Sequence, residues 1–125
     1  MVDLNYFKIV NDTYGHVIGD KVLIFIANEI KKSTYDVVRY GGDEFVIIFP
    51  KEIDEKKAFA ILNDIRESVL KKKLRSKDSM FRTSFSIGVS SYTTEDELNT
   101  ILEAADKNMY EDKLSIKKRV KGITV

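Results

Sequence analysis

The sequence predicts an α/β sandwich in which helices pack against a mixed β-sheet that has a hairpin near its centre. Two observations lead to this fold class. Stretches with the helical spacing of apolar residues alternate along the chain with strand-like stretches. In the first half of the 125 residues, apolar and β-branched residues flank a Gly-Gly pair, which is typical of two strands joined by a tight turn. This pattern favours neither a helical bundle nor a doubly wound parallel fold.

The beginning of the chain predicts a very short extended segment followed by two helices. Residues 1–4 are too few for a full strand, and helical spacing begins directly after them. Apolar side chains share one face of the first helix, over residues 7–14, whereas Lys8 and Asn11 lie three apart on another face. A break containing two glycines should end this helix. The second helix is expected over about residues 20–32.

The hairpin is expected over about residues 36–49, and the only proline, Pro50, closes it. The consecutive glycines Gly41-Gly42 can both take the positive φ angles that a two-residue primed turn requires. They also leave backbone without side chains, which a bulky anionic ligand can approach closely. Two carboxylates, Asp43 and Glu44, follow at once. Since neighbouring side chains of an extended chain point to opposite faces, we expect these two acids to do different work.

The second half of the chain predicts two more helices and further strands. An amphipathic helix is expected over residues 54–72, followed by a polar connection at 75–79 and a half-buried strand over 81–91. Thr94-Glu95-Asp96-Glu97 has the form of a capping box, so the last helix should begin there. Residues 120–125 are expected to form a short final strand.

Composition and charge describe one ordinary globular domain over residues 1–125. Apolar residues make up 43% and charged residues 33% of the sequence. The net charge of +1 gives no reason to expect nucleic acid or an anionic membrane as the main partner. Absence of cysteine excludes disulfides and thiolate metal sites, and no apolar run approaches the roughly 20 residues of a membrane span. With no signal peptide at its start, the sequence fits a cytoplasmic protein.

Three blocks of sequence, in a fixed order, carry a resemblance to a known family. The first runs from Asp3 to Asp20 and holds Phe-Lys, Asn-Asp, Gly-His and Gly-Asp pairs at set spacings. The second is Arg-Tyr-Gly-Gly-Asp-Glu-Phe at residues 39–45, and the third is Ala-Asp-Lys-Asn-Met-Tyr-Glu-Asp-Lys at residues 105–113. Together they resemble the GGDEF domain of diguanylate cyclases over nearly the whole chain. The resemblance implies a nucleotide-cyclase-like, ferredoxin-like α+β sandwich.

This resemblance implies an enzyme that condenses two GTP molecules to cyclic di-GMP and pyrophosphate. In the family each GTP is held by one domain of a face-to-face pair, so GTP and a second GGDEF domain (a homodimer) are the implied partners. Asp3, the backbone carbonyl of Leu4, and Asp43 match the family's ligands for Mg²⁺ (or Mn²⁺), which takes one or two protein carboxylates plus phosphate oxygens and water. Either Asp43 or Glu44 would accept the proton of the attacking 3′-hydroxyl group.

The resemblance also assigns residues to the two ends of the nucleotide. Asn11 and Asp20 match the family's guanine-binding residues, and a carboxylate can accept from both N1–H and the exocyclic amine of guanine, which would select GTP over ATP. Taken alone, Asp20 would be an ordinary helix N-cap. The only histidine, His16, is interpreted as structural. The remaining matches surround the phosphates: Lys8, Lys113, the backbone N–H groups of Tyr6 and Phe7, Gly42 for close approach, and Lys117 in place of an arginine.

The chain departs from the family pattern in two places that bear on activity. Only Met1 and Val2 precede Asp3, where the family has a full strand and a helix. We therefore expect the first strand to be largely missing and the isolated chain to make little product. Either the chain is a fragment or processed form of a parent protein, which would carry an upstream sensor or regulatory domain, or another copy or segment supplies the missing pairing. The family's Arg-x-x-Asp product-inhibition motif before the hairpin is absent, and residues 31–36 stand in its place.

Two alternative functions remain open to the sequence. One is a GGDEF-type module that binds GTP or a regulatory partner without turnover, which fits the short start of the chain. The other is a ferredoxin-like nucleic-acid-binding domain, which would need exposed aromatic residues on its sheet and a basic face. Phe45 and Phe49 are better explained as core residues, so the nucleic-acid-binding domain is the weaker alternative.

Overall fold

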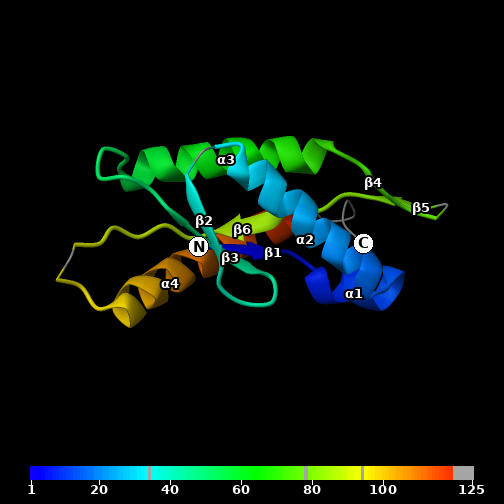
Figure 1. Ribbon diagram of the computed structural model, residues 1–125, viewed down its shortest axis with the longest axis horizontal. Helices are drawn as coiled ribbons and strands as arrows, with labels where there is room; N and C mark the ends of the chain where they lie inside the picture. Colours follow the sequence, from blue (N-terminus) through cyan, green and yellow to red (C-terminus); the bar gives the residue numbers. More distant parts are fainter. Residues whose placement is uncertain (34, 78, 94, 120–125) are drawn as a thin grey trace.

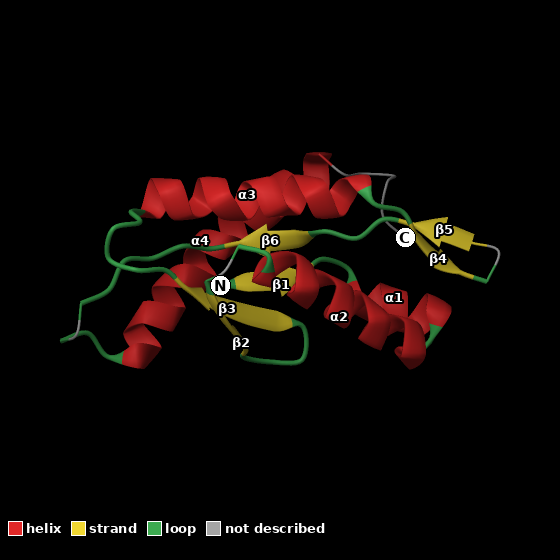
Figure 2. Cartoon of the chain, turned by 45° about the horizontal axis from the view of Figure 1, so that its top comes forward, coloured by secondary structure: helices red, strands yellow, loops and turns green. Residues whose placement is uncertain are grey.

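The computed structural model describes residues 1–33, 35–77, 79–93 and 95–119, with side chains up to residue 115. A four-stranded sheet with strand order β2-β3-β1-β6 forms its centre, and β4 and β5 form a separate two-stranded sheet (Figures 1 and 2). The strands are β1 Val2–Leu4, β2 Asp36–Arg39, β3 Glu44–Ile48, β4 Leu74–Ser76, β5 Ser79–Phe81 and β6 Phe85–Ile87. The helices are α1 Phe7–Tyr14, α2 His16–Lys31, α3 Glu55–Lys71 and α4 Leu98–Arg119. The α+β sandwich expected from the sequence is confirmed.

Strand β1 is as short as the sequence indicates, yet it lies inside the sheet and pairs on both sides. Its middle residue, Asp3, is opposite Glu44 of β3 on one side and Ser86 of β6 on the other. The Gly88 N–H donates to the Met1 carbonyl at 2.9 Å, which extends the pairing beyond β1. The three residues of β1 therefore join the hairpin to β6.

The expectation of a mixed sheet is wrong for the described residues, because every strand pairing among them is antiparallel. Strands β1 and β2 do run in the same direction, since each is antiparallel to β3. The hairpin, however, places β3 between them, so they are not neighbours. Strand directions are mixed, but they alternate across the sheet and no parallel pair forms.

The alternation of side chains along β1 separates the core from the candidate site. Val2 and Leu4 belong to one buried apolar cluster with residues of α2, α3, β3 and β6, including Ile26, Leu62 and Phe85. Asp3 lies between Val2 and Leu4 in sequence, so it points to the opposite face, where α4 packs (Figure 1). The sheet thus buries its apolar side against α2 and α3 and presents Asp3 toward α4.

Helix α1 has the bounds that the sequence predicts, but α2 begins about four residues earlier than expected. The chain leaves the helical conformation only at Gly15, whose φ of 91° is one that glycine adopts readily. Helix α2 resumes at His16, and Gly19 is buried within it. Asp20 is therefore an exposed residue inside α2, and the alternative of an ordinary N-cap is wrong.

Further along the chain, α3 agrees with the prediction and the segments after it do not. Asp54 caps α3 by accepting a hydrogen bond from the Lys57 N–H at 2.7 Å. The expected polar connection is instead the β4–β5 hairpin, which stands apart from the main sheet (Figure 2). The expected strand over residues 81–91 is reduced to β6. Helix α4 begins at Leu98, and both Thr94 of the capping box and residues 120–125 lie outside the described residues.

One ion pair closes the outer edge of β6. Arg66 of α3 donates to Asp112 of α4 at 2.6 Å, and both side chains are almost completely buried. Asp112 also accepts from the Ile87 N–H at 2.7 Å, while Arg66 reaches the Phe85 carbonyl at 3.4 Å. The two side chains occupy the hydrogen-bonding groups that a further strand would use, which protects an otherwise open edge. No helix in the described part of the chain is long and apolar enough to cross a membrane.

We predict that Asp112→Ala lowers the free energy of unfolding by about 3–5 kcal/mol, because it leaves the Arg66 charge buried without a partner. Chemical denaturation followed by circular dichroism measures the change. The double variant Arg66→Met with Asp112→Ala removes both charges and should be less destabilised than Asp112→Ala alone. A loss below about 1 kcal/mol for the single variant would contradict a structural role for this pair.

Candidate active site

The loop of residues 40–43 joins β2 to β3 and is wider than the predicted primed turn. Neither Gly41 nor Gly42 has a positive φ angle, so the turn prediction is wrong. The backbone N–H groups of Tyr40 and Gly41 both point to the Glu44 carbonyl, at 2.9 and 3.4 Å. Glycine suits position 41 for space, since a Cβ there would lie 3.1 Å from Glu44 Oε2. At Gly42 a Cβ would meet nothing within 4 Å, so this backbone is open to approach.

The acids that the sequence analysis assigned to a metal come together where β1 adjoins the hairpin. Asp3 is the cross-strand partner of Glu44, and the Leu4 N–H donates to the Asp43 carbonyl at 3.0 Å. Backbone pairing therefore holds Asp43 beside β1, next to Asp3. Because the ladder itself makes these contacts, the separation of the carboxylates depends on strand register and not only on side-chain rotamers.

Lys113 reaches this group of acids from α4. Its Nζ donates to Asp3 Oδ2 at 2.7 Å, and Asp3 is 8% exposed. The other carboxylate oxygen, Asp3 Oδ1, is buried and has no hydrogen-bond partner within the described residues. An ionised carboxylate that is buried with one oxygen unpaired is costly, so Asp3 retains an unused capacity to bind a cation or a proton donor.

The pKa values of Asp43 and Glu44 are both raised above their ordinary values. Burial raises the pKa of Asp43, and the negative charge of the neighbouring Asp3 carboxylate raises it further. Burial also raises the pKa of Glu44, and the charges of Asp3, Asp43 and Asp106 add to that rise. The Lys113 ammonium group opposes both shifts. One lysine therefore compensates this cluster only in part, and an added cation would be stabilised there.

The residues present suit a small divalent cation. Asp3 Oδ1 and the Asp43 carboxylate supply oxygen ligands from adjoining segments, and the Leu4 carbonyl directly follows Asp3. Within the described residues, no three His, Asp or Glu side chains gather into a metal cluster. Mg²⁺ does not need such a cluster, because it keeps several waters and commonly takes only one or two protein carboxylates beside phosphate oxygens.

Asn11 and Gly19-Asp20, which the sequence analysis assigned to guanine, lie together where α1 packs against α2. The Asn11 carboxamide lies directly over Gly19, so that a side chain at position 19 would collide with its Oδ1. Asp20 follows Gly19 and is exposed. The structure thus brings the Asn11 amide against the residue that precedes Asp20, where α1 meets α2.

The start of α1 supplies uncapped backbone donors close to β1. Tyr6 precedes the helix with a φ of 58°, which is unusual for a residue other than glycine, and no side chain caps the helix. The first N–H groups of a helix have no partner inside it. Those of Phe7 and Lys8 are therefore available to an anion, and the exposed Lys8 side chain adds a charge beside them.

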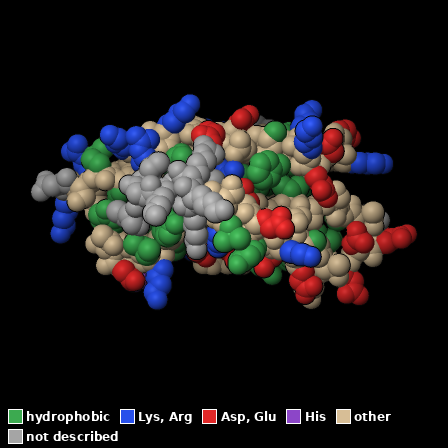
Figure 3. Space-filling view, turned by 180° about the vertical axis from the view of Figure 1, so that it is seen from behind, with side chains coloured by type: hydrophobic (Ala, Val, Ile, Leu, Met, Phe, Trp, Pro, Cys, Tyr) green, Lys and Arg blue, Asp and Glu red, His purple; other side chains and the backbone are tan. Residues whose placement is uncertain are grey.

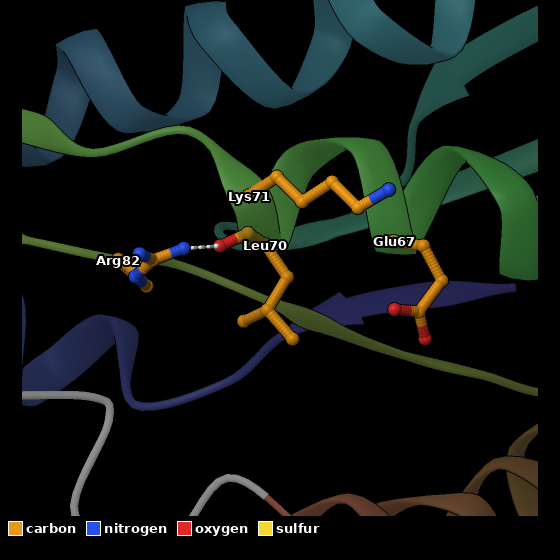
Figure 4. A pocket seen from close by; sticks show the side chains of 4 residues that line it. All are labelled: Glu67, Leu70, Lys71 and Arg82. Atoms are coloured by element: carbon orange, nitrogen blue, oxygen red, sulfur yellow. Dashed lines mark hydrogen bonds between the residues drawn. The ribbon is translucent and has the colours of Figure 1, made fainter.

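The surface has one hollow beside the acid cluster and another at a distance from it. One, of about 340 Å³, borders the hairpin and the first part of α4 and is lined by residues that include Tyr40, Glu44, Glu103 and Asp106. The other, of about 330 Å³, lies at the far end of α3, where Arg82 donates to the Leu70 carbonyl at 2.8 Å (Figure 4). Asp3 and Asp43 line neither of them. Strand pairing thus holds Asp3 and Asp43 together, and Glu44 borders one of these two hollows.

One residue that the sequence analysis did not single out makes two hydrogen bonds in the hairpin loop. His16 is exposed at the first position of α2, and the side chain of Lys117 lies outside the described residues. Arg39, in contrast, donates from Nε to the Gly41 carbonyl at 3.3 Å and from Nη2 to the Gly42 carbonyl at 2.7 Å. Its position immediately before the Tyr-Gly-Gly segment was the only sequence signal for this role.

Comparison with known proteins gives one consistent result. The family model described as "Diguanylate cyclase, GGDEF domain" matches residues 1–119. Diguanylate cyclase A of Treponema denticola is 39% identical over 124 residues, a match that covers 96% of this chain and 33% of that protein. Diguanylate cyclase DgcZ of Escherichia coli is 37% identical over 116 residues and covers 90% of this chain and 39% of that protein. The chain therefore spans between about a third and two fifths of these relatives.

A solved structure agrees with the fold. The GGDEF domain of DgcB from Caulobacter crescentus, in complex with c-di-GMP, superposes with a TM-score of 0.82 at 31% sequence identity. The superposition covers 91% of this chain and 68% of that one. The sheet order and helix arrangement described above are thus those of a known domain.

We predict that Asp43→Asn stabilises the metal-free protein at pH 7, because it removes a charge that the folded state disfavours. A carboxyl group whose pKa is raised on folding favours the folded state at low pH and loses that contribution as pH rises through the folded pKa. The variant's advantage should therefore shrink as the pH is lowered through the raised folded-state pKa of Asp43 toward about 3.9, the ordinary pKa of an aspartate in the unfolded chain. Thermal melts of both proteins from pH 4 to 8 test this, and an advantage independent of pH would contradict it.

Proposed function

Since the chain belongs to the GGDEF domain family of diguanylate cyclases, we propose that it is a catalytic domain that condenses two GTP molecules into cyclic di-GMP. In each of two equivalent steps the 3′-hydroxyl oxygen of one GTP forms a bond to the α-phosphorus of the other. The bond between that phosphorus and the β-phosphate bridging oxygen breaks, so two pyrophosphates leave in all. The hydroxyl proton passes to a carboxylate.

One observation carries this proposal: Asp3 and Asp43 adjoin where β1 meets the hairpin, with a buried and unpaired oxygen on Asp3. Phosphoryl transfer depends mainly on positioning and on neutralising phosphate charge. Asp3, the Leu4 carbonyl and Asp43 would hold the divalent cation, which when bound neutralises the phosphates and orients them. Lys113, Lys8 and the backbone N–H groups of Tyr6 and Phe7 add positive charge and donors around the same polyphosphate, and Gly42 leaves room for it.

Glu44 is the better candidate for the proton acceptor. Asp43 already interacts with the Asp3 side chain, and holding a cation would use its remaining lone pairs. Glu44 lies across from Asp3, and its pKa is raised above the usual range for a glutamate. A carboxylate with a raised pKa takes a proton more readily near neutral pH than an ordinary one does. We therefore propose Glu44, and not Asp43, as the proton acceptor.

Asn11 and Asp20 would hold the guanine base. Asn11 lies about one turn further along α1 than the uncapped N–H groups, at the surface where α1 meets α2. A nucleotide lying along this part of α1 can place its phosphates at the start of the helix and its base beside Asn11 and Asp20. One domain would hold one GTP in this way, so the reaction needs a second copy of the domain to present the other GTP.

The proposal also covers the longer protein to which this domain would belong. Because the chain covers only part of the length of its relatives, we propose that an upstream sensor or regulatory domain controls pairing of the catalytic domains in a longer natural protein. A non-catalytic module that binds GTP keeps the same guanine and phosphate contacts and differs only in the outcome of the assay below. A nucleic-acid-binding function gains no support. On the face shown in Figure 3, Lys and Arg side chains lie at both ends and are interspersed with Asp and Glu, so this face has no continuous basic surface.

We predict that the natural protein converts GTP with Mg²⁺ into cyclic di-GMP, and that ATP gives no cyclic product. Asp43→Ala should abolish the product because the cation loses one of its two carboxylates. Glu44→Gln should lower kcat by about 100-fold or more while leaving Mn²⁺ affinity nearly unchanged, because it removes only the proton acceptor. Chromatography with mass detection measures the product.

The contradicting outcomes separate the alternatives. If the folded protein, with two copies of the GGDEF domain present, binds GTP tightly but makes no cyclic di-GMP, the domain is a binding module and not an enzyme. Equal turnover of ATP would show that Asn11 and Asp20 do not read the base. Loss of Mn²⁺ binding in Glu44→Gln would make Glu44 a metal ligand instead of the proton acceptor.

A further inference from the structure

We infer that Arg39 is a positioning residue that holds the Asp43 carboxylate in place through the glycine loop. Arg39 is the last residue of β2, and its side chain turns back over the loop that follows. Its guanidinium group donates to the Gly41 carbonyl from Nε and to the Gly42 carbonyl from Nη2, at 3.3 and 2.7 Å. The inference rests on the proposed role of Asp43 but concerns a residue outside the proposed substrate and metal contacts.

The second of these contacts acts on Asp43 through a single rigid group. The Gly42 carbonyl and the Asp43 N–H belong to the same planar peptide unit and point in opposite directions. Arg39 holds the carbonyl end of this unit, and the N–H end belongs to the backbone of Asp43. The position of the Asp43 Cα atom, and with it the direction of the Asp43 side chain, therefore depends on a peptide plane that Arg39 fixes from the other side.

The carbonyl of Asp43 is held independently. It accepts from the Leu4 N–H of β1 at 3.0 Å. Arg39 thus fixes the peptide unit before Asp43, and β1 fixes the unit after it. Without Arg39, the loop would retain the contacts of Tyr40 and Gly41 with the Glu44 carbonyl. The peptide between Gly42 and Asp43, however, would lose the side-chain hydrogen bond that Arg39 donates to its carbonyl.

The geometry calls for the shape of arginine and not only for its charge. The guanidinium group presents several N–H donors in one plane, so it can serve two carbonyls of successive residues at once. A lysine ammonium group at the same place is a single point charge on a flexible stem. Within the described residues, Arg39 forms no ion pair, and its side chain is exposed, so these two carbonyls are its recorded partners.

The change in metal affinity on removal of the Arg39 charge distinguishes a positioning role from a purely electrostatic one. A positive charge near a cation site disfavours the cation, so removal of the Arg39 charge alone would strengthen metal binding. Loss of positioning has the opposite result, because Asp43 would no longer be held in a binding geometry. Weaker metal binding in a variant without the charge is thus evidence for positioning.

The test uses Arg39→Met, which keeps the length of the stem and removes the donors, and Arg39→Lys, which keeps the charge. Arg75→Met, at an exposed arginine of β4 far from the hairpin, is the matched control. Two readouts need no turnover: backbone ¹⁵N order parameters of residues 41–43, and Mn²⁺ affinity from the electron paramagnetic resonance signal. We expect Arg39→Met to lower the loop order parameters below about 0.6 and to weaken Mn²⁺ binding about tenfold.

Arg39→Lys should lie nearer to Arg39→Met than to the unchanged protein in both readouts, and Arg75→Met should match the unchanged protein. Unchanged loop order in Arg39→Met would overturn the inference whether or not the protein makes cyclic di-GMP. Unchanged or tighter Mn²⁺ binding in that variant would also overturn it. If the unchanged protein binds no Mn²⁺ but its loop loses order in Arg39→Met, the proposed function fails while the positioning of the loop by Arg39 stands.

Discussion

The two-sided pairing of β1 is the constraint on which the rest of the structure depends. Its three residues join β3 to β6, and the direction of the side chains along them separates two environments. Val2 and Leu4 are buried in the apolar core, while Asp3 faces α4. A shift of one residue in this register would turn Asp3 into the core and expose its apolar neighbours, so packing and site geometry are fixed by the same hydrogen bonds.

The acid cluster works against stability in the absence of a cation. Burial and mutual repulsion raise the pKa of both Asp43 and Glu44, and Lys113 compensates them only in part. Elsewhere the fold treats its buried charges differently: Arg66 and Asp112 pair directly, and Glu29 is held by Lys72 and Lys32. A cluster left partly uncompensated, in a fold that pairs the buried side chains of Arg66 and Glu29, is typical of a functional site.

Local pattern predicted the elements whose signal lies within a few turns of chain. The periodicity of residues 7–14 and 54–72 gave α1 and α3, and the apolar segments around Gly41-Gly42 gave the β2–β3 hairpin. Strands β4 and β5 were missed because three-residue strands carry too little alternation to recognise. The early start of α2 was missed because Gly15 alone separates α1 from α2, whereas the sequence suggested a longer break containing both Gly15 and Gly19.

The candidate site was predicted through resemblance to a family, and its internal contacts were not. Asp3 and Lys113 are 110 residues apart, and no local rule connects them. The link from Arg39 to the Gly42 carbonyl depends on the path of a loop that differs from the expected primed turn.

The central claim is that Asp3, the Leu4 carbonyl and Asp43 hold the divalent cation. Paramagnetic broadening of backbone amide signals by Mn²⁺ tests this claim most directly. The account predicts that signals of Asp3, Leu4 and Asp43 broaden first while those of β4 and β5 persist. Broadening centred on Glu103 and Asp106, with Asp3 and Asp43 unaffected, would contradict it.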